Sequence, residues 1–146
     1  MAYEGDVLTY TPANLDFSTV YAVVVTGAKW NPCGHALLFA PFKSAISSGN
    51  DGSYFQVAGA HTLPRIMSQD GYERYLKENK KSEVTRYAVD LPNPDGAVNR
   101  LVELMLKPWM WAVLPHNCAA FVEDVVSAGG SSAGLYSNCP RLEDFK

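Results

Sequence analysis

Basic residues are in short supply in this chain, which has 12 lysines and arginines against 15 aspartates and glutamates and a net charge of −3. Binding to duplex nucleic acid depends on a cluster of basic side chains that neutralises phosphates. The densest basic cluster, Lys77, Lys80 and Lys81, is interrupted by Glu78 and fits the polar face of a helix. The composition therefore argues against nucleic acid as the main partner.

Long hydrophobic runs are also missing. Residues 20–27 fall far short of the roughly 20 apolar residues that a membrane-spanning helix needs, and residues 101–114 are interrupted by Glu103, Lys107 and Pro108. The opening MAYEGDVLTY has neither the positive segment nor the apolar segment of a secretory signal. We therefore expect no transmembrane segment and no signal peptide. The protein would be made in the cytoplasm, and any export would use a signal-independent secretion system.

Cysteine is scarce and its count is odd. Cys33, Cys118 and Cys139 allow at most one internal disulfide, which excludes a disulfide scaffold and leaves open whether Cys33 pairs with Cys139. Cys33 and His35 form a C-x-H pair, but no C-x-x-C or H-x-x-x-H pair accompanies it. We therefore expect neither a metal site nor another cofactor.

What the chain does have is enough apolar material for a core. Apolar residues make up 47% of its 146 residues and charged residues 18%, so residues 1–146 suit a single domain that needs no metal or disulfide to fold. Runs of β-branched and aromatic residues alternate with segments of helical periodicity, which predicts an α+β fold with a small antiparallel sheet and packed helices. Strands are expected over Tyr21–Gly27, His35–Phe39, Tyr54–Ala58 and Val84–Leu91, and helices over Gln69–Asn79, Asp95–Lys107 and from about Asn117 to Gly129.

The segment LPHNCAAFVEDVV, residues 114–126, carries the most chemical information. Asn117 is the expected N-cap of the last helix, which places Cys118 in its first turn. Backbone amides and the positive end of a helix stabilise a thiolate there, and a lowered pKa makes a cysteine nucleophilic. The alternative interpretation is that Cys118 is a small core residue on an apolar helix, which is the usual role of such a cysteine.

A cysteine nucleophile needs a base, and the chain offers only three histidines, His35, His61 and His116. His35 follows a glycine at the start of an apolar strand, a rigid position from which it could face the start of a helix. A third polar group must orient the imidazole. Both Gln56, on the next expected strand, and His61 are candidates for that role.

These residues resemble a known superfamily. The Gly34-His35 pair before an apolar strand, Gln56 on a further strand and the Asn117-Cys118-x-x-Phe121 helix are similar to the papain-like hydrolases of the NlpC/P60 group. The order of histidine before cysteine resembles the circularly permuted branch, which includes the relatives of lecithin–retinol acyltransferase. The resemblance covers about residues 21–128 and implies a permuted papain-like fold.

The resemblance also implies roles for individual residues. Cys118 would be the nucleophile, His35 the base, and Gln56 or His61 the orienting residue. The backbone amide of Cys118 would stabilise the oxyanion. The substrate would lie near four further residues: Trp109, Trp111, His116 and Asn117.

For function, the resemblance implies a cysteine amidase or endopeptidase that cleaves a peptide amide bond in bacterial peptidoglycan. A small chain without a signal peptide would suit a secreted antibacterial effector, a toxin whose partner would be an immunity protein. Two alternatives stay open. The same residues could serve a thiol acyltransferase or thioesterase acting on lipid, or the domain could be a non-catalytic binding module.

Overall fold

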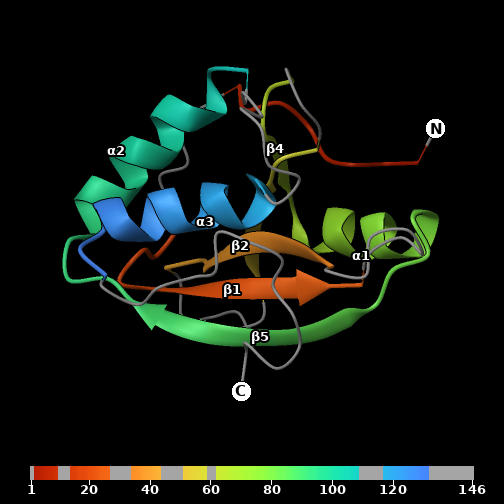
Figure 1. Ribbon diagram of the computed structural model, residues 1–146, viewed down its shortest axis with the longest axis horizontal. Coiled ribbons are helices and arrows are strands. Elements are labelled where there is room, and N and C mark those ends of the chain that lie inside the picture. Colours follow the sequence, from red (N-terminus) through yellow and green to blue (C-terminus); the bar gives the residue numbers. More distant parts are fainter. Residues whose placement is uncertain are drawn as a thin grey trace.

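The computed structural model describes residues 2–9, 14–26, 34–43, 51–58, 62–108 and 117–131. Within these residues the protein has the expected α+β architecture, a five-stranded antiparallel sheet with three helices (Figure 1). The elements are β1 (Thr19–Val25), β2 (His35–Pro41), β3 (Gly52–Gln56), β4 (Arg65–Met67), α1 (Gln69–Glu78), β5 (Glu83–Asp90), α2 (Pro94–Met105) and α3 (Asn117–Ala128).

The strands lie in the order β4-β3-β2-β1-β5, and every neighbouring pair is antiparallel. The first residue of β2, His35, pairs with the last residue of β1, Val25. On the other side of β2, Leu38 pairs with Phe55 of β3. This register sets which side chains of β2 and β3 are neighbours at the end of the sheet where β2 begins.

Side chains of the central strands alternate between two buried clusters, one on each face of the sheet. On β2, Ala36, Leu38 and Ala40 belong to the larger cluster, whereas Leu37 and Phe39 belong to the smaller one. Both faces are therefore covered by apolar side chains, which explains why β2 reads as a continuous apolar run.

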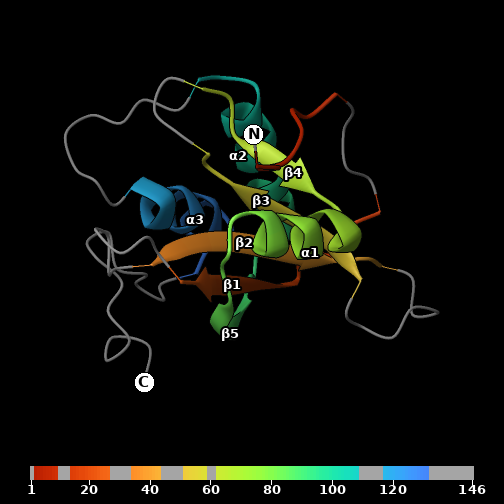
Figure 2. The same cartoon turned by 90° about the vertical axis from the view of Figure 1, so that its right-hand side faces the viewer.

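The larger cluster lies under α2 and α3, and we call this side of the sheet the α3 face. Four residues of α3 at helical spacing are fully buried in it: Phe121, Val122, Val125 and Val126. The smaller cluster contains Tyr72 and Tyr75 of α1, and we call this side the α1 face. In Figure 2 the end of the molecule that carries α1 is turned toward the viewer.

All seven predicted elements are present, with shifted ends. β1 and β3 each begin two residues before the predicted strand, and β2 extends two residues beyond Phe39. Pairing with the neighbouring strand sets these ends, since Gly52 and Ser53 bond to Pro41 and Ala40. The strand β4 was not predicted, because three residues are too few for a periodic pattern.

Candidate active site

His35 occupies the first position of β2, and the backbone before it explains how the chain enters the strand. Gly34 has a φ of 81°, a conformation that glycine adopts without strain. A Cβ atom at this position would also lie only 2.7 Å from the carbonyl oxygen of Val25. Glycine at position 34 is therefore a local requirement of the backbone that enters β2, and His35 follows it at the end of the sheet.

Gln56 is the last residue of β3 and lies beside His35. The register places Gln56 opposite Leu37, so that Gln56 and His35 are diagonal neighbours on the α1 face. The Nε2 atom of His35 is 2.6 Å from Oε1 of Gln56. Gln56 is only 1% exposed, so this hydrogen bond is sheltered from water.

A second contact of Gln56 determines which nitrogen of His35 carries the hydrogen. The Nε2 group of Gln56 donates a hydrogen bond of 2.8 Å to the backbone carbonyl of Glu4. Because that carbonyl can only accept, the amide must turn its oxygen toward His35. The Nε2–H of His35 then donates to Gln56, and Nδ1 is left as the ring nitrogen with an available lone pair.

The surroundings of His35 favour its neutral form. Burial lowers the pKa of His35 to about 4. The hydrogen bond that His35 donates to Gln56 raises this pKa, and the positive charge of Lys81 lowers it further. The ammonium of Lys81 donates to the carbonyl of Thr26, 2.9 Å away, just past the end of β1. At neutral pH the imidazole is uncharged and can accept a proton at Nδ1.

Cys118 lies in the first turn of α3 as predicted, but Asn117 is the first helical residue and not the N-cap that the sequence predicted. The structure describes the backbone of these two residues but not their side chains. The helix is held in place by its buried apolar residues and by an ion pair with α2, in which Arg100 contacts both carboxylate oxygens of Asp124 at 2.8 and 2.9 Å. The amides of a first helical turn are unpaired within the helix and stabilise negative charge.

The two halves of the predicted site belong to different faces of the sheet. His35 and Gln56 share the α1 face with Leu37, whereas α3 packs on the opposite face. Both β2 and α3 begin at the same end of the sheet, the end at which α1 lies (Figure 1). His35 and the first turn of α3 therefore lie toward the same end of the sheet, on opposite faces.

Several predicted residues lie outside the part of the chain that the structure describes: Cys33, His61, Trp109, Trp111, His116 and Cys139. Within the described part, no three His, Cys, Asp or Glu side chains are grouped so that they could hold a metal ion. No helix in that part is long and apolar enough to cross a bilayer.

Two residues near His35 were missed by the sequence analysis, Glu4 and Lys81. Glu4 acts through its backbone carbonyl, which no residue pattern can reveal. Lys81 comes close to His35 only through the fold, because it follows α1 and the bond to Thr26 joins residues 55 positions apart.

Comparisons with protein-family models, curated proteins and solved structures give no match to this chain.

Proposed function

We propose that the protein is a cysteine hydrolase in which Cys118 is the nucleophile, His35 the base and Gln56 the residue that orients it. The observation that carries the proposal is the part-buried His35–Gln56 hydrogen bond of 2.6 Å, located at the end of the sheet where the Cys118 helix begins. Activation of a thiol requires a neutral imidazole with a defined tautomer, which His35 supplies, and the first turn of a helix, which α3 supplies at the same end of the sheet. In this proposal the sheet and helices form the permuted papain-like arrangement.

The proposed reaction is acyl transfer through a thioester. Nδ1 of His35 takes the proton of the Cys118 thiol, and the sulfur attacks the carbonyl carbon of the substrate. The backbone N–H of Cys118 donates to the oxyanion that forms. The imidazolium then gives its proton to the leaving amine, the C–N bond breaks, and water hydrolyses the thioester with His35 acting again as base.

The substrate class follows from the resemblance to NlpC/P60 enzymes, which favours a peptide amide bond of bacterial peptidoglycan. An effector acting there would be exported and would have an immunity protein as its partner. The lipid acyltransferase alternative needs a cavity that buries an acyl chain, because each methylene contributes only about 0.8 kcal/mol.

The test is digestion of purified peptidoglycan followed by mass spectrometry of the fragments. The parent protein should release peptide fragments with new amine and carboxyl ends. Cys118→Ala and His35→Ala should abolish release to a similar extent, since nucleophile and base act as a unit. Gln56→Ala should slow release on the order of a hundredfold, because an orienting residue is lost.

Cys139→Ala is the matched control, a loss of a different thiol that should leave activity unchanged. Release of fatty acid from phospholipid with intact peptidoglycan would replace the amidase proposal by the lipid alternative. Absence of both activities in the folded parent protein would favour the binding module.

A further inference from the structure

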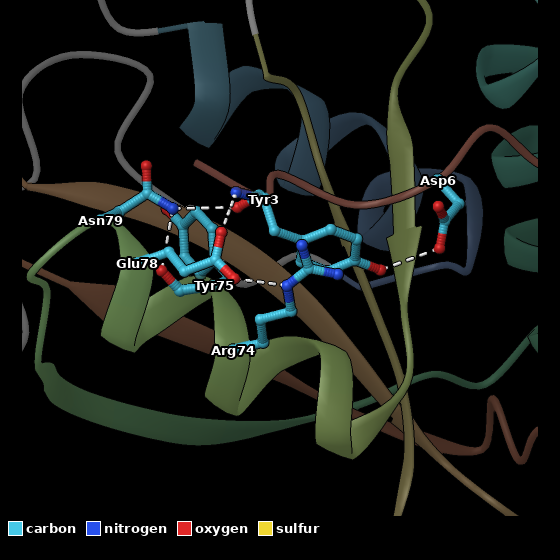
Figure 3. A network of polar contacts seen from close by, with 6 residues as sticks. All are labelled: Tyr3, Asp6, Arg74, Tyr75, Glu78 and Asn79. Atoms are coloured by element: carbon cyan, nitrogen blue, oxygen red, sulfur yellow. Dashed lines mark hydrogen bonds and ion pairs between the residues drawn. The ribbon is translucent and has the colours of Figure 1, made fainter. Parts of the chain in front are cut away.

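An extended segment near the start of the chain, Tyr3–Asp6, lies against α1 and β4, and we call it the strap. Figure 3 shows how α1 holds its first residue. The backbone N–H of Tyr3 donates to Glu78 at 2.9 Å, and the carbonyl of Tyr3 accepts from the side chain of Asn79 at 2.9 Å. The guanidinium of Arg74 lies over the Tyr3 ring, 4.5 Å from its centre.

The other end of the strap is anchored on β4. Asp6 and Ile66 exchange two backbone hydrogen bonds of 2.9 and 2.7 Å, and the side chain of Asp6 accepts from the Tyr3 hydroxyl at 2.8 Å (Figure 3). Gly5 has a φ of 106°, and a Cβ atom there would lie 2.7 Å from Cβ of Arg65. The strap can therefore approach β4 this closely only with glycine at position 5.

Glu4 lies between these two anchors, so the position of its carbonyl is set from both sides. That carbonyl accepts the 2.8 Å hydrogen bond from Nε2 of Gln56. An amide side chain can present either its oxygen or its nitrogen to a neighbour after a half-turn. Next to His35 both orientations are possible in principle, because the imidazole can donate or accept at Nε2 according to its tautomer.

We propose that the strap is a positioning device for the catalytic histidine: the Glu4 carbonyl sets the orientation of Gln56, and Gln56 in turn keeps the hydrogen of His35 on Nε2. This inference rests on the proposed function for its catalytic consequence, but the tautomer that it concerns exists whether or not the protein turns over a substrate. Glu4 is a positioning residue, since it acts through Gln56.

The consequence of displacing the strap follows from the same contacts. Without the Glu4 acceptor, the Gln56 amide can turn and donate from its own nitrogen to Nε2 of His35. The imidazole hydrogen then moves to Nδ1, the nitrogen that takes the proton of the thiol in the proposed reaction. His35 in this tautomer cannot act as the base at Nδ1, although every catalytic side chain is still present.

The test is Gly5→Ala, which forces the strap away from β4. The matched control is Gly130→Ala, at another glycine with positive φ, 86°, beyond the far end of α3. Both variants introduce the same methyl group and the same kind of backbone strain. The readout is the ¹⁵N spectrum of the imidazole at pH 7, which distinguishes the protonated from the unprotonated nitrogen. The signals of His35 are assigned from their loss in His35→Asn.

We expect the parent and Gly130→Ala to carry the hydrogen of His35 on Nε2, and Gly5→Ala to carry a substantial fraction of it on Nδ1. Activity of Gly5→Ala should fall by at least about tenfold in kcat, because a wrong tautomer removes the base. A second substitution distinguishes a turned Gln56 amide from a general loosening of the structure around His35. In Gly5→Ala/Gln56→Glu the carboxylate can only accept, so the hydrogen should return to Nε2.

A His35 tautomer that is the same in Gly5→Ala as in the parent, with backbone shifts showing that the strap has moved, would overturn the proposal. If Gly5→Ala does not fold, the double variant Glu78→Ala/Asn79→Ala releases Tyr3 from α1 and gives the same test. A parent protein without hydrolase activity, in which the tautomer still switches, would remove the proposed function and leave the strap mechanism standing. An active parent protein whose His35 tautomer is the same in both variants would remove the strap mechanism and leave the proposed function standing.

Discussion

His35 combines an environment that disfavours its charge with a hydrogen bond that orients its ring. The pKa of about 4 keeps the imidazole neutral in the folded protein, whereas in the unfolded chain it titrates near 6.5. Below pH 6.5 the unfolded state therefore binds a proton that the folded state does not. Stability linked to His35 is fully present above pH 6.5 and falls as the pH drops toward 4.

The prediction at the residue scale is a loss of about 2 kcal/mol of unfolding free energy between pH 7 and pH 5 through His35 alone. Urea unfolding of the parent protein and of His35→Gln at both pH values measures it. The parent should lose more stability over this interval than the variant by that amount, and the two should change in parallel between pH 7 and pH 8. Equal losses between pH 7 and pH 5 would show that His35 is protonated in the folded state.

At the scale of elements, the ends of the helices are determined by short local patterns. The side chain of Ser68 accepts a hydrogen bond of 3.0 Å from the backbone of Gly71, and α1 begins at the next residue, Gln69. At the C-terminal end of α3, the backbone N–H groups of Gly129 and Gly130 donate hydrogen bonds to carbonyls of the last turn of the helix. The Ser68 cap matters for the site because α1 holds the strap.

We expect Ser68→Ala to lower the unfolding free energy by about 1 kcal/mol, because an amide of the first turn of α1 loses its acceptor. Chemical denaturation measures the effect. Ser127→Ala, the same change at an exposed position inside α3, should leave stability nearly unchanged, since alanine suits a helix interior. Equal effects of the two substitutions would contradict a capping role for Ser68.

For the molecule as a whole, the arrangement of α3 on the sheet depends on packing of the α3 face. Phe121 is fully buried there, three residues after Cys118, so its ring ties the start of α3 to the core of the sheet. Removing a large buried side chain costs the free energy of its transfer from water to the core, and it also costs the free energy of the cavity that is left behind. The position of the first turn of α3 relative to the sheet is thus coupled to the stability of the whole domain.

Phe121→Ala should cost roughly 3–5 kcal/mol of unfolding free energy, as loss of a buried phenylalanine does. Leu106→Ala is the control, because Leu106 is 60% exposed at the end of α2 and should change stability little. Denaturant titration of both variants gives the comparison. A cost below about 1 kcal/mol for Phe121→Ala would mean that α3 is not tied to the sheet by this ring.

The sequence by itself determined the helices and the central strands, because their information is local. The spacing of Phe121, Val122, Val125 and Val126 matches the buried side of α3, and the serine before Gln69 is the cap of α1. Hydrophobic periodicity and capping act over a few residues, so they can be read without knowing the fold. The placement of Cys118 in a first helical turn belongs to this local information.

Only the tertiary structure decided which residues meet. The strand ends differ from the predicted ones because pairing with a neighbouring strand sets them. The strand β4 forms because it pairs with β3 on one side and with the strap on the other, and not because of a pattern in its own three residues. The sequence favoured Gln56, with His61 as the alternative, to orient His35, and the register of β2 with β3 places Gln56 in hydrogen-bond contact with it. The Glu4 carbonyl is invisible to sequence reasoning, since every residue has one and only the fold determines which of them meets Gln56.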